Sequence, residues 1–174
     1  MSTTYQEFYQ INENFSLRKI DLRDSLEIYQ LTKSNLRHLQ YLEWSHLPNY
    51  NETNATFGIT NALLKWDAGK QWTYEILEHN KIIGDFQIRP TALEEAFEMG
   101  YWIDYKHRLQ GIVTRVINYV CQINKKMGKK IAVLLIRPDN IPSIKLAYSL
   151  GFIQYTNQNN PFALASYNTF VKQI

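Results

Sequence analysis

The chain has 174 residues, of which 45% are hydrophobic and 20% are charged, and this composition excludes a disordered protein. The formal net charge of +3 is poor support for a nucleic-acid-binding protein. One cysteine excludes an internal disulfide, and the four histidines show no metal-ligand spacing, so we expect no metal.

The targeting signals are also absent from the sequence as given. No apolar run has the length of a membrane helix, and residues 1–14 are polar without a secretory signal core. We therefore expect a soluble cytoplasmic protein with no membrane or nucleic-acid partner. We also expect a single domain over residues 1–174, with residues 1–13 as a flexible arm.

Hydrophobic periodicity predicts one strand and three helices in the first part of the chain. Alternation predicts a strand over 15–20, and Asp21 is a candidate N-cap of a helix that ends near Thr32. A second, short helix begins at Asn35, and a third includes residues 59–66.

The period then changes to that of strands. Residues 72–77 and 83–89 alternate on either side of a polar turn and predict a hairpin. Residues 97–104 predict a further strand, with Phe97 and Met99 on one face and Glu98 on the other.

The last part of the chain contains a βαβ unit. An amphipathic helix over 112–127 connects the strand before it to an apolar strand over 131–136, and such a crossover gives a parallel pair. A helix over 141–150 and strands over 152–155 and 162–171 follow. These elements predict an α/β (α+β) protein with a mostly antiparallel sheet and one parallel pair.

The loop between strand and helix, 108–114, is the most informative segment. A helix N-terminus has unsatisfied N–H groups and a partial positive charge, and Gly111 would let a phosphate approach the backbone. Ordinary turn geometry also explains a glycine at this place. No G-x-S-x-G or G-x-G-x-x-G motif occurs, and Cys121 lies on the apolar stripe of the helix, where a buried, inert thiol is expected.

The sequence of this loop, RLQGIV, resembles the R/Q-x-x-G-x-G/A motif of the GCN5-related N-acetyltransferases (GNAT). Over residues 15–172 the chain is similar to their RimJ/RimL-like branch, although Leu109 stands where a glycine is common. The segments that carry this resemblance are NLRHLQYLEW (35–44), IGD (83–85), FEMGYWID (97–104), HRLQGIVT (107–114), NIPS (140–143) and LGF (150–152).

The resemblance implies the GNAT fold, with about seven strands in a mixed sheet, a parallel pair that splays apart and four to five flanking helices. It implies acetyl-CoA as the co-substrate, with its pyrophosphate on the loop and its pantetheine beside the splayed strands. The residues implied to bind acetyl-CoA are Trp102, Ile103, Arg108, Leu109, Gln110, Gly111, Ile112, Val113, Thr114 and Asn140.

The resemblance also implies direct acetyl transfer to an amine. Ser143 would lie near the sulfur and assist the leaving thiolate, because Ala147 stands where many members have a tyrosine acid. Ordinary exposure on the first turn of a helix is the alternative for Ser143. Glu98 or Asp85 could act as the base through water, and a solvated or paired carboxylate is the alternative for each.

The same resemblance places Tyr41 and Trp44 at the acceptor site, although core packing would explain either aromatic residue. An α-amine has a pKa of about 8 and lysine one of about 10.4, so a chain without an obvious strong base suits an N-terminal amine better. We expect an acetyltransferase for a protein N-terminus such as that of a ribosomal protein, as a monomer or homodimer. The alternatives are a small-molecule N-acetyltransferase and a non-catalytic acyl-CoA-binding module.

Overall fold

The computed structural model describes residues 5–42 and 49–174. Their contacts form two compact units. Unit 1 comprises Met1–Gln87 and Tyr101–Ile112, and unit 2 comprises Ile88–Gly100 and Val113–Ile174.

The described residues form eight strands in one mixed sheet, with the order β1-β2-β3-β4-β5-β6-β8-β7. This confirms the predicted GNAT-type mixed sheet, with one strand more than expected. Two strands, β4 (Lys81–Pro90) and β5 (Ala96–Ile103), begin in one unit and end in the other.

The N-terminal segment of unit 1 belongs to the sheet. The strand β1 (Phe8–Gln10) pairs antiparallel with β2 (Phe15–Lys19), and β2 pairs with β3 (Trp72–Glu78). Tyr5 and Tyr9 are buried, and the Tyr5 ring lies 4.3 Å from that of Trp72. The prediction of a flexible arm is therefore wrong for residues 5–13, because aromatic burial fixes this segment.

The first helical region begins as predicted and ends differently. Asp21 accepts a hydrogen bond from the Arg23 N–H and caps a 3₁₀ turn (Leu22–Asp24), which leads into α1 (Ser25–Asn35). Among the described residues 36–42, a second 3₁₀ turn (Leu36–His38) is the only helical element, so the predicted short helix that begins at Asn35 is wrong for these residues. Asn35 is the last residue of α1. Its side chain bonds to the Asp104 carboxylate and to the Tyr105 N–H, so the helix ends at this position.

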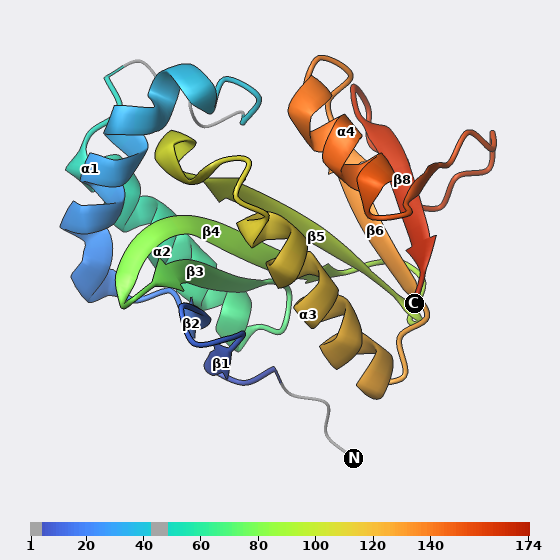
Figure 1. Ribbon diagram of the computed structural model, residues 1–174, viewed down its shortest axis with the longest axis horizontal. Coiled ribbons are helices and arrows are strands. Elements are labelled where there is room, and N and C mark those ends of the chain that lie inside the picture. Colours follow the sequence, from blue (N-terminus) through green and yellow to red (C-terminus); the bar gives the residue numbers. More distant parts are fainter. Residues whose placement is uncertain (1–4, 43–48) are drawn as a thin grey trace. The chain divides into compact units, whose positions relative to one another are not determined.

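The second long helix, α2 (Glu52–Asp67), starts earlier than its apolar periodicity indicated. Asn51 and Asn54 form a reciprocal capping box, a polar signal that the hydrophobic pattern does not contain. Its buried face packs on α1 and β3, where the Trp66 ring meets the Tyr74 ring edge-on at 5.0 Å (Figure 1).

Unit 2 contains the parallel pair. β5 and β6 (Ile131–Ile136) pair over four residues and this pairing ends at Met99↔Leu134, whereas β6 pairs with β8 (Asn168–Gln173) through Ile136. The β6 backbone therefore runs two residues beyond its last partner on β5. This is the geometry expected of a parallel pair that splays apart.

The C-terminal strands are shorter than predicted. β7 contains only Ile153–Gln154, and residues 162–167 are loop rather than strand. Asn160 holds this loop, since its Oδ1 accepts from the Phe162 N–H and its Nδ2 donates to Thr169 Oγ1 at 2.8 Å. These side-chain bonds compete with a strand ladder.

Two helices complete unit 2, and both confirm the prediction. α3 (Ile112–Lys126) leads to Gly128 at φ +85°, and α4 (Ile141–Ser149) packs against β6. Cys121 is buried on α3, and burial raises the pKa of its thiol to about 11. An ionised, reactive thiol is therefore disfavoured.

One buried carboxylate in unit 1 has a pKa near neutrality. Glu75 on β3 is 1% exposed, and its Oε2 accepts two hydrogen bonds from Arg18, which also bonds to Asp24. The Glu75 Oε1 is buried and has no hydrogen-bond partner among the described residues. Burial raises the pKa of Glu75 from 4.5 to about 7, although the Arg18 charge opposes this shift.

Because the folded state holds this proton more tightly than the unfolded chain, the Glu75 contribution to the free energy of unfolding falls as the pH rises from about 4.5 to about 7. Glu75→Gln removes this fall. We expect the Tm of the variant minus that of the wild type to rise by roughly 5 °C between pH 5 and pH 7.5. Thermal melts at both pH values test this, with the exposed Glu13→Gln as a control in which the difference stays constant.

Candidate functional site

The loop before α3 has an unusual backbone. After Asp104, a 3₁₀ turn (Tyr105–His107) and an extended Arg108 lead to two left-handed residues, Leu109 at φ +62° and Gly111 at φ +72°. Leu109 is fully exposed, and a left-handed leucine costs about 1–2 kcal/mol. Such strain is typical of functional loops.

This loop can bind an anion. Left-handed residues turn successive N–H groups toward one side, and the first N–H groups of α3 have no partner within the helix. Ile112 and Val113 bury their side chains in the stripe of α3, so only their backbone can serve a ligand. Thr114 is half-buried, and Gln110 donates from Nε2 to the Lys106 carbonyl at 2.9 Å.

The beginning of the loop is held by a buried polar cluster in unit 1. Asn35 Nδ2 donates to Asp104 Oδ1 at 2.9 Å, and Asn35 Oδ1 accepts from the Tyr105 N–H at 2.8 Å. His107 places Nδ1 3.0 Å from Asp104 Oδ2 and Nε2 3.3 Å from Glu78 Oε2. Burial alone would raise the pKa of Asp104, but hydrogen bonds from the Asn35 side chain, the Lys106 backbone and the His107 ring outweigh it and lower the pKa.

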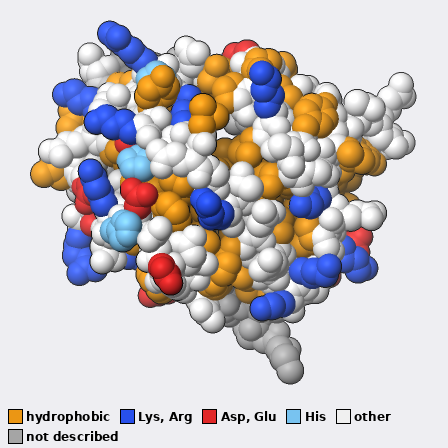
Figure 2. Space-filling view, viewed as in Figure 1, with side chains coloured by type: hydrophobic (Ala, Val, Ile, Leu, Met, Phe, Trp, Pro, Cys, Tyr) orange, Lys and Arg blue, Asp and Glu red, His pale blue; other side chains and the backbone are white. Residues whose placement is uncertain are grey.

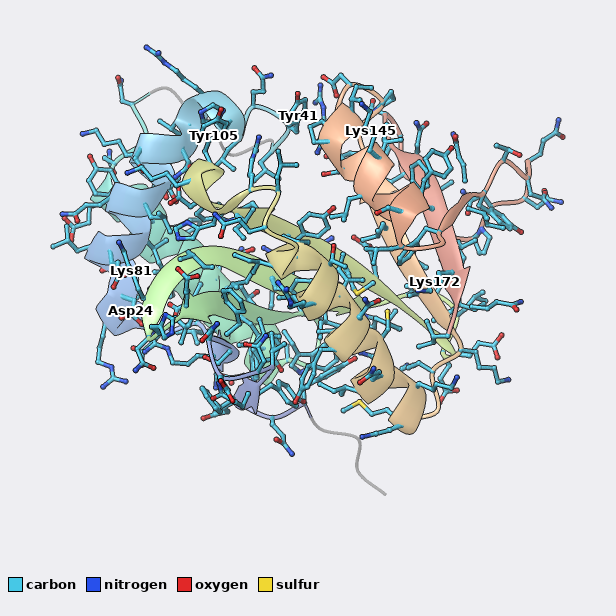
Figure 3. The ribbon with its side chains drawn as sticks, viewed as in Figure 1. Asp24, Tyr41, Lys81, Tyr105, Lys145 and Lys172 are labelled. Atoms are coloured by element: carbon cyan, nitrogen blue, oxygen red, sulfur yellow. The ribbon has the colours of Figure 1, made fainter. Side chains whose placement is uncertain are left out.

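Arg108 is held by the same part of the fold. Its Nη2 donates to the His38 carbonyl at 3.1 Å, and its guanidinium lies over the Tyr105 ring, 5.6 Å from the centroid. The His38 and Tyr105 rings stack at 3.9 Å with 11° between their planes. Figure 3 shows Tyr105 beside the C-terminal end of α1.

The surface of unit 1 around this cluster carries charge of both signs. Figure 2 shows histidine, basic and acidic side chains close together over the region of α1 and the loop before α3, at the left of the view. Arg37, Lys106 and Arg108 form no ion pair with another described residue. A ligand phosphate near the loop would therefore meet cations that no described carboxylate neutralises.

In unit 2, the N-terminus of α4 carries Asn140 and Ser143. Asn140 is the N-cap, since its Oδ1 accepts from the Ser143 N–H at 3.3 Å. The three-residue spacing of this pair thus has a structural explanation in helix capping. The Asn140 Nδ2 donates to no other described residue, and the Ser143 side chain is half-buried.

The candidate bases differ in their surroundings. Glu98 on β5 forms an ion pair with Arg89 on β4 in unit 2, and burial raises the pKa of Glu98 against the effect of this arginine. Asp85 on β4 lies 3.3 Å from Gln87 Nε2 in unit 1. A raised pKa makes Glu98 a stronger base than an ordinary glutamate.

No tyrosine acid stands at the position that Ala147 occupies on α4. Ala147 is fully buried. The next residue, Tyr148, is exposed and its hydroxyl donates to Gln154 Oε1, so neither side chain replaces the tyrosine acid that the family resemblance implies in many members. Tyr41 is half-buried on the segment that follows α1 (Figure 3). Trp44, the other predicted acceptor residue, lies outside the described residues.

Gly84 explains how β4 approaches the strand end that leads to the loop. A Cβ at Gly84 would overlap the Trp102 carbonyl oxygen and lie 2.9 Å from the Ile103 Cα. The Ile83 carbonyl accepts from the Asp104 N–H at 2.7 Å. The glycine of the IGD segment is therefore required for close backbone contact with Trp102 and Ile103.

Sequence reasoning missed the polar cluster and the Arg89 partner of Glu98. Asn35, Asp104 and His107 each stood in a segment quoted for the family resemblance, but nothing in one sequence joined these segments. The alternation of buried and less buried residues along β4 and β5 was the one available signal that Arg89 and Glu98 could form a pair on neighbouring strands.

Residues 5–42 and 49–174 contain neither a metal-binding cluster nor a membrane-spanning helix. No group of three or more histidine, cysteine or acidic side chains there is arranged to hold a metal ion. No helix in the same residues is long and apolar enough to cross a membrane.

Comparison with known proteins identifies relatives over most of the chain. The family model described as "Acetyltransferase (GNAT) domain" matches residues 14–153. The ribosomal-protein-serine acetyltransferase of Escherichia coli K12 is 26% identical over 150 residues, covering 84% of this chain and 83% of that protein.

Solved structures show the same fold. A RimL ribosomal-protein α-N-acetyltransferase, with coenzyme A joined to a cysteine as a disulfide, has a TM-score of 0.83 and 20% identity over 97% of this chain and 98% of that one. A microcin self-immunity acetyltransferase (MccE) in complex with acetyl-CoA and AMP has a TM-score of 0.84 and 22% identity over the whole of both chains.

The close approach at Gly84 gives a testable consequence. We expect Gly84→Ala to lower the Tm by about 5 °C, because the Trp102 backbone must move and such overpacking costs about 1–3 kcal/mol. The matched control is Gly58→Ala on α2, whose added Cβ meets no atom within 4 Å. An unchanged Tm for Gly84→Ala in thermal melts would contradict the required contact.

Proposed function

This chain belongs to the GNAT acetyltransferase family and is an acyl-CoA-dependent N-acetyltransferase, and we propose that it acetylates the α-amine of a protein N-terminus. The observation that carries the cofactor part is the loop at 108–112, where two left-handed residues and a helix N-terminus present backbone N–H groups. The acceptor part rests on the ribosomal-protein-serine acetyltransferase to which the chain is similar.

Different residues would bind different parts of acetyl-CoA. The N–H groups of Gly111, Ile112 and Val113 would bind the pyrophosphate, and Arg108 would add a fixed positive charge. Backbone groups of β6 beyond Leu134, where its pairing with β5 ends, would bind the pantetheine amides as an added strand does.

The transfer needs a neutral amine and an assisted thiolate. The amine nitrogen forms a bond to the thioester carbon, the carbon–sulfur bond breaks, and the ammonium proton leaves to a base. Glu98, whose pKa burial raises, would accept this proton through water. The Ser143 hydroxyl would donate to the departing sulfur, and the Asn140 amide Nδ2 would donate to the pantetheine.

An α-amine acceptor fits this modest base. At pH 7 the neutral form costs roughly 1.4 kcal/mol for an α-amine and about 4.6 kcal/mol for lysine. Tyr41, with Trp44 beyond the described residues, would form part of the acceptor wall.

A small amine is the second candidate acceptor. It is supported by the similarity in fold to MccE, at a TM-score of 0.84, because MccE is a microcin self-immunity acetyltransferase and not a ribosomal-protein acetyltransferase. An acceptor panel that contains peptides and small amines separates these two candidates.

Cofactor binding is tested by thermal unfolding with acetyl-CoA. At about 100 times its Kd, the ligand should add roughly 2.7 kcal/mol and raise the Tm by about 5–10 °C. Gly111→Asp places a negative charge where the pyrophosphate would bind and should abolish the shift. Gly128→Asp makes the same change at another left-handed glycine, after α3, and should keep it. Loss of the shift in both variants, or in neither, would count against the loop.

Acetyl transfer is tested by mass spectrometry with short peptides that have a free N-terminal serine. We expect acetylation at the α-amine and none at lysine in N-terminally blocked peptides. Ser143→Ala should lower kcat by about 100-fold with little change in acetyl-CoA binding.

The two roles of Asn140 can be separated by substitution. Asn140→Ala removes the helix cap and the amide donor, and should cost about 1 kcal/mol of stability as well as affinity for acetyl-CoA. Asn140→Asp keeps the cap acceptor and loses only the donor. Full affinity in the aspartate variant would exclude Asn140 from cofactor binding.

A further inference from the structure

Two segments far apart in the sequence supply polar side chains to one cluster in unit 1. Asn35 ends α1, Asp104 follows β5, and His107 lies in the turn after it. Asn35 is 1% exposed and Asp104 is 8% exposed. Buried amides and carboxylates destabilise a fold unless their hydrogen bonds are satisfied.

The hydrogen bonds of Asn35 are complete. Its Nδ2 donates to Asp104 Oδ1 and to the Leu31 carbonyl, each at 2.9 Å, and its Oδ1 accepts from the Tyr105 N–H. The other Asp104 oxygen faces His107, whose second ring nitrogen faces Glu78. One side chain at the end of α1 thus holds both the side chain of residue 104 and the backbone of residue 105.

These two contacts lie at the point where the loop leaves the sheet. Tyr105, fixed at its N–H by Asn35, stacks on His38, and its ring lies under the Arg108 guanidinium. The position of Arg108 therefore depends on the bonds that Asn35 makes to the first residues of the loop.

We propose that Asn35 and Asp104 are positioning residues that set the backbone of residues 105–111, and with it Arg108, for binding the phosphates of acyl-CoA. This inference rests on the proposed function, because it assigns the loop to acyl-CoA. It requires that affinity for the phosphate-bearing part of the molecule depends on the Asn35–Asp104 pair. The acetyl-pantetheine part, which lacks the nucleotide, should not depend on it.

The test exchanges the amide and the carboxylate. Asn35→Asp puts two carboxylates face to face and should weaken CoA binding about ten-fold or more. Adding Asp104→Asn restores the match, because the amide at 104 can donate to the carboxylate at 35 and still accept from His107. The carboxylate at 35 still accepts from the Tyr105 N–H, and the donated bonds to the Leu31 carbonyl and to Ser34 Oγ within α1 are lost. We expect the double variant to recover most of the affinity.

Two readouts separate positioning from general stability. The KM for acetyl-pantetheine should stay within about two-fold in Asn35→Asp, whereas the KM for acetyl-CoA rises about ten-fold. Hydrogen exchange without any ligand should become faster in residues 105–111 and return to the wild-type rate in the double variant. Gln71→Glu makes the same amide-to-carboxylate change at another buried site of unit 1, beside Thr73, and should leave both readouts unchanged.

The outcomes are distinct. Selective loss of CoA binding in Asn35→Asp, with recovery in the double variant, supports positioning. Equal loss for acetyl-CoA and acetyl-pantetheine, or no recovery, overturns it. A wild type that neither binds CoA nor transfers acetyl refutes the proposed function, and with it the assignment of these residues to acyl-CoA, even where the exchange rates show that the pair orders the loop.

Discussion

The loop before α3 and its surroundings depend on the hydrogen bonds of the Asp104 carboxylate. Asp104 directly follows β5, its backbone N–H donates to the Ile83 carbonyl, and its carboxylate receives hydrogen bonds from Asn35 and His107. A buried charge is tolerable only with such partners. Because those partners come from α1 and from the loop itself, they fix where the strand stops and in which direction the chain continues.

The features of the candidate site depend on the backbone conformation as much as on the side chains. Gly84 allows close contact with Trp102, the left-handed Leu109 and Gly111 turn N–H groups together, and the β5–β6 pairing ends at Met99↔Leu134. None of these features adds a reactive group. Each exposes or aligns peptide dipoles, and fixed dipoles stabilise charge without the reorganisation that water requires.

The sequence predicted most of the fold because long periodic segments determine it. The buried stripe of α3, the apolar run of β6 and the β3–β4 hairpin were all identified by their period. The errors occurred where side-chain hydrogen bonds or aromatic burial override periodicity, as at Asn35, at Asn160 and in the N-terminal strand with Tyr9. The loop at Gly111 was predicted from its residues as a candidate phosphate site, whereas the Asn35–Asp104 and Arg89–Glu98 pairs depend on tertiary contacts that one sequence does not contain.

The buried thiol of Cys121 can serve as a probe for the local opening of α3. It lies on the inner face of α3 in unit 2, and its pKa of about 11 leaves it protonated at neutral pH. A thiol reagent can therefore label it only when α3 opens, so the labelling rate measures the opening of that helix. Since the chain has no other cysteine, this signal reports on unit 2 without interference from unit 1.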